Sequence, residues 1–391
     1  MKKYDVIVIG AGAAGTMCGI ESAKRGRKTL LIEHNKQIGN KILISGGGRC
    51  NFANIGASHQ NFISQNEHFM KSALSRYTQY DFISLVESHK IEYYEKTLGQ
   101  LFCKKSSKEI INMLLSESKK AGLEIITECK VFEIKKNENG GYFLRTQNDE
   151  FICDSLVIAT GGLSFPNRGA TNFSYQIAEQ FDLDIVKLRP GLVPLKLDIN
   201  KNLDFESISG VSFFANATCN GVNFKESLLF THKGLSGPVI LQISNYWNSG
   251  DKISINIEPD KNIKANLLSN LKSSLLVKNF LGKYLPAKFA DIFCDYFSFN
   301  KPIKSMNSKE IDNLISTLEN WEIYPVGTEG YKKAEITLGG INTNELSSKT
   351  FETKKHSGLF FIGEALDVSG WLGGYNFTWA WSCGWAAGQY V

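Results

Sequence analysis

The sequence lacks the marks of a membrane-spanning, secreted or zinc-binding protein. No stretch approaches the roughly twenty apolar residues that cross a bilayer, and no cleavage-site pattern follows the short apolar run at 6–9. The cysteines form neither a CxxC pair nor a His/Cys cluster with zinc spacing, although there are eight of them: Cys18, Cys50, Cys103, Cys129, Cys153, Cys219, Cys294 and Cys383. We therefore expect reduced thiols, no metal, no membrane partner and a cytoplasmic location.

The sequence also lacks a strong charge of either sign. It has 44 basic and 39 acidic side chains, a formal net charge of +5, and 42% of its 391 residues are hydrophobic. This is the composition of a globular protein, and the length predicts two or three domains, because a single core rarely serves so many residues. The small basic surplus neither requires nor excludes RNA as a partner.

A βαβ unit opens the chain. Residues 4–9 are strand-like, 13–25 have helical character, and 28–33 form a second strand. Glu33 ends that strand and is followed by His34. A carboxylate at this place accepts hydrogen bonds from ribose hydroxyls and repels a 2′-phosphate.

Gly10, Gly12 and Gly15 form a G-x-G-x-x-G motif between the first strand and the helix. In a dinucleotide-binding unit the first glycine permits a tight turn, the second lets the backbone approach the pyrophosphate, and the third allows close helix packing. The helix start at Ala13 and Ala14 then presents unpaired N–H groups to the phosphates. The alternative is a glycine-rich turn without a ligand.

Two later segments favour FAD over NAD. A strand at 156–159 runs into Thr160 and Gly161, and a strand near the C-terminus runs into Gly363 and Glu364. Each could be an ordinary core strand, but their order after the glycine motif is typical of FAD-binding proteins. A last helix is expected from about 375 to 389, and its N–H groups could stabilise a reduced flavin at Gly373, Gly374, Tyr375 and Asn376. No second G-x-G-x-x-G follows a strand, so NADH or NADPH is expected to dock only transiently.

The remaining pattern mixes helices and strands. Ser106 and Glu109 form a capping box before a helix that Gly122 ends. From about residue 190 the sequence alternates as in an antiparallel β region. Further helices are expected at 266–277, 287–296 and 308–321, and further strands at 124–126, 131–135, 142–146, 333–338 and 359–362.

Five motifs together resemble one family. They are KILISGGGRCNFAN at 41–54, ATGGLSFPNRG at 159–169, FTHKGLSGPVILQIS at 230–244, AEITLGGI at 334–341 and GLFFIGEALDVSGWLGGYNFTWAWSCGWAAGQ at 358–389. Over nearly its whole length the chain is similar to the BaiN/YhiN-type family of NAD(P)/FAD-dependent flavoproteins. It departs from that family at Cys103, where a proline is common, and at Trp371-Leu372, where the turn is commonly polar.

The resemblance implies an α/β fold in three parts. A Rossmann-type FAD-binding domain is expected at 1–190 and 330–391, an inserted β-barrel-like domain at 191–260 and 322–335, and a small helical domain at 261–321. The resemblance also implies FAD contacts from Ala13, Glu33, Lys41, Gly47, Gly48, Arg49, Asn51, the backbone of Val131, Glu364, Asp367, Gly374 and Asn376.

Three residues are candidates for the chemistry. Cys50 follows three glycines and could deliver a proton opposite a hydride, or it could be a small packing residue beside the flavin. His232 is the second acid–base candidate, with a structural role as its alternative. Arg49, like Lys41, could favour an anionic reduced flavin or bind only the FAD phosphates.

Four tryptophans cluster at the C-terminus: Trp371, Trp379, Trp381 and Trp385. Base stacking and core packing are both open to them. We expect that Trp379 and Trp381 do not both face inward on one helix.

Family activities implied by the resemblance include reduction of uridine to dihydrouridine in large-subunit (23S) ribosomal RNA, reduction of a conjugated C=C bond in bile-acid intermediates, and aminoacetone oxidation. We expect an FAD-dependent oxidoreductase that reduces an activated C=C bond, with uridine in ribosomal RNA as the leading substrate. The alternatives are a small-molecule enone or amine substrate, and a flavin-carrying sensor with little turnover.

Overall fold

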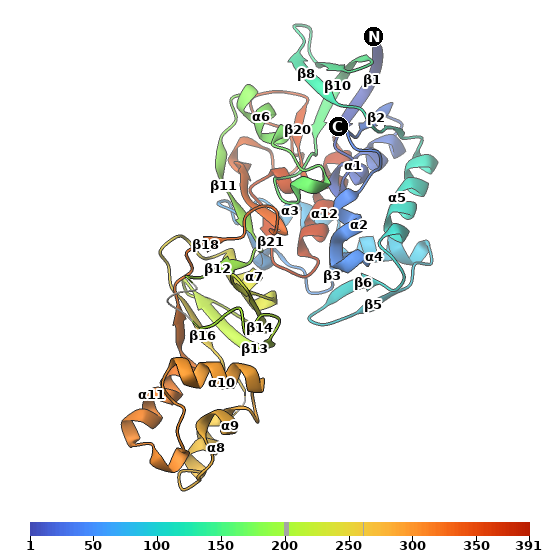
Figure 1. Cartoon of the computed structure of the whole chain (residues 1–391). Coiled ribbons are helices and arrows are strands. Elements are labelled where there is room, and N and C mark those ends of the chain that lie inside the picture. The colour runs from blue at the N-terminus through green and yellow to red at the C-terminus, as the bar shows by residue number, and fades with distance from the viewer. Residues whose placement is uncertain (199–202, 261) are drawn as a thin grey trace. The chain divides into compact units, whose positions relative to one another are not determined.

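Two compact units make up the computed structural model, which describes residues 1–198, 203–260 and 262–391. Unit 1 comprises 1–189 and 336–391, and unit 2 comprises 190–335 (Figure 1). The bounds expected for the β-barrel-like and helical domains include residues 199–202 and 261, which lie outside the described residues. The division into three domains stays a prediction.

The core of unit 1 is a parallel sheet whose strands come from both ends of the chain. Their order is β7–β2–β1–β10–β20, with bounds Glu124–Ile126 (β7), Thr29–Ile32 (β2), Lys2–Ile9 (β1), Glu150–Ile158 (β10) and Leu359–Phe361 (β20). The central strands are runs of Val, Ile and Leu because both of their faces are buried, as in other parallel sheets. This confirms the expected α/β fold class.

The antiparallel strands β8 (Val131–Lys136) and β9 (Tyr142–Thr146) extend this sheet. The first half of β10 pairs with β9, and its second half pairs with β20. The other elements of unit 1 are α2 (Asn40–Gly48), β3 (Asn51–Asn54), β4 (Phe62–Ile63), α3 (Lys71–Arg76), α4 (Gln79–Ser88), β5 (Tyr93–Glu95), β6 (Gln100–Cys103), α5 (Lys108–Ala121), α6 (Phe173–Gln180), β11 (Ile185–Gly191), β19 (Ile336–Ile341) and β21 (Ser369–Gly370).

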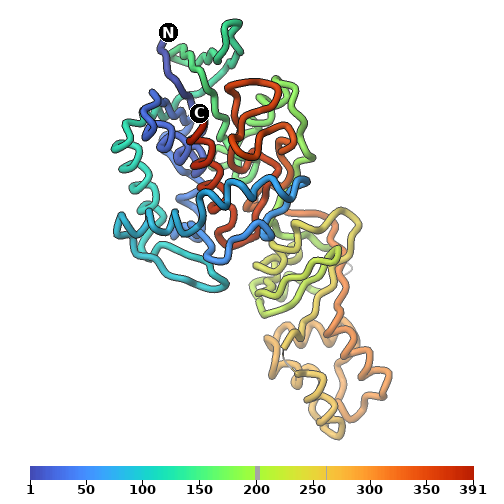
Figure 2. The backbone as a smooth tube through the Cα atoms, turned by 180° about the vertical axis from the view of Figure 1, so that it is seen from behind, coloured from blue at the N-terminus to red at the C-terminus, as the bar shows by residue number. Residues whose placement is uncertain are grey.

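The first and last helices of the chain, α1 (Ala13–Lys24) and α12 (Tyr375–Gly388), pack against each other (Figure 2). Small residues allow this close approach. A Cβ atom built on Gly384 would lie 2.4 Å from the carbonyl oxygen of Ala14. The bounds expected for both helices are confirmed within one residue.

The expectation that Trp379 and Trp381 do not both face inward on α12 is wrong. Trp379 and Trp381 are both buried, at 1% exposure each, because α12 is covered on nearly all sides. The Trp379 indole N–H donates to the Gly363 carbonyl oxygen (3.2 Å), and that of Trp381 donates to the Phe52 carbonyl oxygen (2.9 Å). Neither ring is available to stack on a nucleic-acid base.

Unit 2 contains a seven-stranded antiparallel sheet and a group of helices. The strand order is β17–β16–β13–β14–β15–β12–β18. The strands are β12 (Leu195–Lys196), β13 (Ser212–Cys219), β14 (Val222–Thr231), β15 (Gly234–Ser236), β16 (Ile253–Asn256), β17 (Trp321–Ile323) and β18 (Gly327–Thr328), and the helices are α7 (Pro238–Ser244), α8 (Ile263–Ser269), α9 (Val277–Leu281), α10 (Ala287–Tyr296) and α11 (Ser308–Glu319).

The helix expected at 266–277 is wrong. The chain forms α8 and then α9, and the segment between them pairs with residues 301–304 instead of continuing as a helix. Ser273 and Leu275 accept backbone hydrogen bonds there from Lys304 (2.9 Å) and Ile303 (3.0 Å). Long-range pairing has overridden the local helical pattern.

We predict that Gly384→Ala lowers the free energy of unfolding by about 1–3 kcal/mol, because its Cβ would overlap the backbone of α1. Urea unfolding followed by tryptophan fluorescence measures the change. Gly19→Ala in α1 is the matched control, because its Cβ would meet only the Leu123 side chain, at 3.0 Å. A Gly384→Ala protein as stable as the control would contradict the close contact.

Candidate functional site

The carboxyl ends of four parallel strands meet at one edge of the unit 1 sheet. Backbone hydrogen bonds join them: Gly10 N–H to Ile32 (2.8 Å), Ala159 N–H to Ile9 (2.8 Å), and Ile362 N–H to Ile158 (3.1 Å). Gly10, Glu33, Thr160 and Gly363, all predicted from the sequence, are thereby brought together. Ligands of open α/β sheets bind at this edge.

Glu33 holds the turn after β1. Its buried carboxylate accepts hydrogen bonds from the Ala11 N–H (2.9 Å) and from the backbone (2.9 Å) and side-chain (2.7 Å) nitrogens of Asn35. The exposed His34 ring lies beside it, with Nδ1 3.2 Å from Oε1. Glu33 therefore fixes the backbone of the glycine motif as well as offering an acceptor.

Open space lies in front of the α1 N-terminus. Gly12 is the N-cap of α1, no side chain caps the helix, and a Cβ built on Gly12 would meet nothing within 4 Å. The other two glycines of the motif are tightly enclosed, since a Cβ would lie 2.6 Å from the Ala159 oxygen at Gly10 and 2.0 Å from the Gly10 oxygen at Gly15. An anion could therefore approach the unpaired N–H groups at Gly12 only.

The glycine segment, residues 45–51, begins in the last part of helix α2. Helix α2 starts at Asn40, and the helical backbone is interrupted at Ser45, Gly46 and Gly47. Built Cβ atoms on Gly47 and Gly48 would meet nothing within 4 Å, so this backbone also borders open space. A backbone hydrogen bond attaches the glycine segment to the residue before α5, because the Gly48 carbonyl accepts from the Ser107 N–H (2.8 Å).

One side-chain amide joins the glycine segment to the start of α12, and another joins α12 to β21. With its amide oriented so that both atoms have partners, Asn51 accepts from the Gly374 N–H (3.2 Å) and donates to the Ala53 and Leu101 carbonyls. Asn376 accepts from the Gly370 N–H (2.8 Å) and donates to the Gly370 carbonyl (2.9 Å). The Asn51–Gly374 hydrogen bond places the uncapped start of α12 beside the glycine segment, and Gly373 and Gly374 have positive φ angles there.

A polar network links α2 to the turn after β20. The Lys41 ammonium forms an ion pair with Glu364 and donates to the Ser164 hydroxyl (2.6 Å). Glu364 Oε1 accepts from that hydroxyl (2.9 Å) and from the Thr337 N–H (3.0 Å). Ser164 and Thr337 were not predicted as site residues, although both lie in motifs that carry the family resemblance.

The remaining predicted contacts lie around the same edge. Asp367 is buried, accepts from the Gln65 N–H (2.8 Å), and has a pKa raised by burial. Thr160 shares a 2.5 Å hydrogen bond with Ser174, and Gly161 has space for a Cβ. Val131 is the buried first residue of β8. Gln65 carried no signal in the sequence.

The three candidates for the chemistry differ in access. Cys50 is wholly buried, and burial raises the pKa of its thiol. Arg49 is exposed and donates to the Tyr94 hydroxyl (3.3 Å). His232 is exposed in the turn between β14 and β15 of unit 2. Its role stays a prediction.

Within 1–198, 203–260 and 262–391, no three or more His, Cys, Asp and Glu side chains are grouped so that they could hold a metal ion. Among these same residues, no helix has both the length and the hydrophobicity that a membrane span needs.

The model of the HI0933-like protein Rossmann domain matches residues 4–390. The chain belongs to the HI0933-like family. A ribosomal RNA dihydrouridine synthase of Escherichia coli (strain K12) is 47% identical, with 100% of this chain and 98% of that protein covered. A 3-dehydro-bile acid delta(4,6)-reductase of Clostridium scindens is 24% identical, with 98% of this chain and 97% of that protein covered.

The fold of this HI0933-like chain is similar to that of a solved structure, a 3-ketosteroid-delta4-(5alpha)-dehydrogenase from Rhodococcus jostii RHA1. The TM-score is 0.50 and the identity is 14%, with 99% of this chain and 97% of that chain covered. The expected family and its class, FAD-dependent oxidoreductase, are confirmed.

The residues of unit 1 fit FAD. The open space at Gly12 lies at an uncapped helix N-terminus, as a pyrophosphate requires, and the Glu33 carboxylate stands at the end of the next strand. A second uncapped N-terminus, that of α12, adjoins the glycine segment. One elongated ligand with an anionic middle could contact all of these groups.

We predict that the native protein has no rapidly reacting thiol near pH 8, because all eight cysteines are buried and the thiolate is the reactive form. Titration with Ellman's reagent should give eight thiols only after unfolding in urea. A fast native thiol that Cys50→Ser removes would show that Cys50 reaches solvent and would restore it as a proton donor.

Proposed function

We propose that the protein reduces uridine to dihydrouridine in large-subunit ribosomal RNA, with NADH or NADPH as the electron donor. One observation carries the proposal: the relative that is 47% identical over the whole chain is a ribosomal RNA dihydrouridine synthase. The reduction adds a hydride to one carbon of the uracil C5=C6 bond and a proton to the other. Bound FAD, once reduced by NADH or NADPH, would supply the hydride.

The residues of unit 1 would divide the binding of FAD among them. The first-turn N–H groups of α1 would bind the pyrophosphate, and Glu33 would accept from the ribose hydroxyls. Asp367 and the Lys41–Glu364 pair would bind FAD at its ribityl and pyrophosphate region. The start of α12 would stabilise negative charge on the ring system.

The shape of the glycine segment supports a flat ligand there. Gly47 and Gly48 present backbone without side chains, and the exposed Arg49 guanidinium follows them. Arg49 would favour the anionic reduced form of the ring by its charge. Cys50 would pack behind the segment, because its thiol is wholly buried and cannot meet a substrate.

A small-molecule C=C bond is the second candidate substrate. The 3-dehydro-bile acid delta(4,6)-reductase supports it, and it too covers nearly the whole chain. Its identity of 24%, against 47% for the RNA enzyme, makes it the weaker candidate.

An RNA substrate and eight unpaired thiols also favour a cytoplasmic location. We further propose the three-domain division, with the helices α8–α11 as the small domain.

We predict that Gly12→Val weakens FAD binding by roughly 10- to 100-fold, since a side chain there would fill the pyrophosphate space at a cost of about 1–3 kcal/mol. Quenching of flavin fluorescence measures the affinity. The Gly12 φ of −79° suits valine, and its Cβ meets no protein atom, so the flavin-free chain should keep its stability. Gly56→Val, in a turn with only ordinary contacts, is the matched control. Unchanged affinity in Gly12→Val would place the pyrophosphate elsewhere.

A second prediction tests the reaction itself. The FAD-loaded protein with NADPH or NADH should convert uridine in an unmodified 23S transcript into a nucleoside two hydrogens heavier, identified by mass spectrometry of digested RNA. The Gly12→Val protein should give little product. Efficient reduction of a 3-oxo-4-ene steroid with no change in the RNA would overturn the proposal in favour of the small-molecule substrate.

A further inference from the structure

The helices of unit 2 carry a surplus of lysine. Residues 262–320 contain eight lysines and five acidic residues. Three of the acids are consumed in ion pairs: Asp291 with Lys278 (2.6 Å), Glu310 with Lys301 (2.5 Å) and Glu319 with Lys264 (3.8 Å). In the part of the chain that the structure describes, five lysines of this segment have no ion pair: Lys272, Lys283, Lys288, Lys304 and Lys309.

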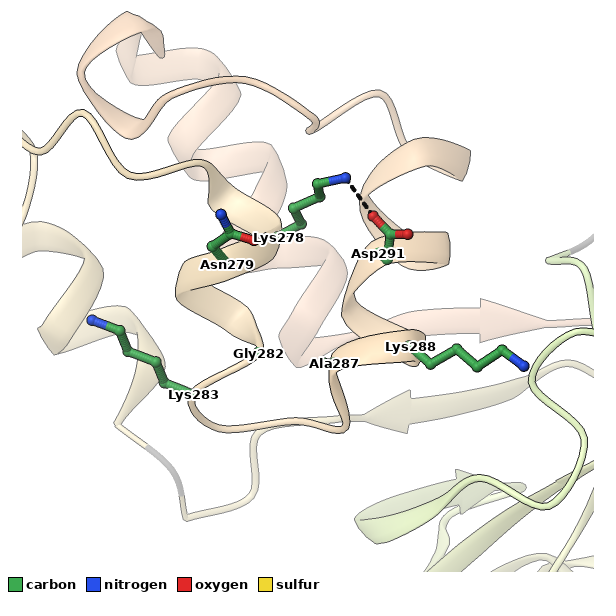
Figure 3. A pocket seen from close by; sticks show the side chains of 7 residues that line it. All are labelled: Lys278, Asn279, Gly282, Lys283, Ala287, Lys288 and Asp291. Carbon is green, nitrogen blue, oxygen red and sulfur yellow. Dashed lines mark hydrogen bonds and ion pairs between the residues drawn. The ribbon is translucent and has the colours of Figure 1, made fainter.

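The fold places four of these lysines in two pairs. The backbone of Lys304 donates to the Ser273 carbonyl (2.9 Å), which brings Lys304 next to Lys272 in the paired segments between the helices. Lys283 and Lys288 line a pocket of about 490 Å³ between α9 and α10. Their side chains extend to opposite sides of that pocket (Figure 3).

The acids near the pocket do not cancel its charge. Asp291 lines it but is paired with Lys278, as the dashed line in Figure 3 marks. Asp204 lies within electrostatic range of Lys288, and the pKa of Asp204 is lowered chiefly by the side-chain hydrogen bond from Ser207 and least by this lysine. Lys283 and Lys288 are both exposed, so the ammonium group of each is accessible to a phosphate.

We propose that four exposed lysines of these helices and the segments between them, Lys272, Lys283, Lys288 and Lys304, together called the lysine surface, bind the sugar–phosphate backbone of the substrate RNA outside the reacting uridine. The inference rests on the proposed function, which supplies a polyanionic substrate. Lysines act as point charges on phosphates and position a nucleic acid without reading its sequence. An anionic membrane is the other polyanion that such a surface fits, and the test below separates the two.

The test compares two variants of the FAD-loaded full chain with equal change in charge. Lys283→Gln/Lys288→Gln removes two cations from the surface, and Lys119→Gln/Lys120→Gln removes two from the last turn of α5 in unit 1. Filter binding measures the affinity for a 23S fragment between about 50 and 200 mM salt. The surface variant should bind roughly 3- to 10-fold more weakly and lose about 1.4–1.8 from the slope of log K against log salt, at 0.7–0.9 per phosphate contact.

The outcomes separate this inference from the proposed function. Reduction of the bound flavin by NADPH should be equal in all variants, which shows that the surface variant is folded. If wild type makes dihydrouridine and the surface variant keeps its RNA affinity and slope, the inference is wrong and the function stands. If wild type makes no dihydrouridine in RNA, the proposed function fails instead. Loss of binding to phosphatidylserine vesicles, with RNA binding unchanged, would overturn the inference in favour of a membrane.

Discussion

The site depends on a backbone contact between the first and last helices. At Gly384 in α12 the chain passes so close to the Ala14 carbonyl of α1 that no Cβ atom fits, and at Gly15 α1 comes still closer to the Gly10 carbonyl in the turn after β1. The contact at Gly384 fixes the α1 N-terminus against α12. The other elements attach to these two helices, Glu33 through the Ala11 N–H and the glycine segment through the Gly374 N–H. Segments from both ends of the chain thus form one cradle.

The local parts of this cradle could be predicted because their signals are short-range. The G-x-G-x-x-G motif, the acid at the end of the next strand and the two later strand ends are each readable within about ten residues. A general rule then places them together, since ligands of parallel sheets bind where the strands end. The structure agrees, with Gly10, Glu33, Thr160 and Gly363 at one edge.

The parts that could not be predicted depend on partners far away in sequence. Thr337 donates its N–H to Glu364, and Gln65 donates to Asp367 across about three hundred residues. The helical pattern of residues 266–277 does not indicate that the Ser273 carbonyl accepts a backbone hydrogen bond from Lys304. The expectation that one face of a helix is exposed to solvent was wrong for Trp379 and Trp381, because α12 lies in the interior of unit 1.

Unit 2 is inserted between two strands that pair with each other. The chain leaves unit 1 through β11 and returns through β19, and these two strands pair, with the Asn342 N–H donating to the Asp184 carbonyl (2.8 Å). Because the two ends of the insertion are already adjacent, its length adds little to the entropy cost of closing it. The proposed FAD contacts all lie in unit 1, whereas the proposed RNA-binding lysines lie in the insertion. Change in the insertion can therefore leave the cradle of unit 1 unaltered.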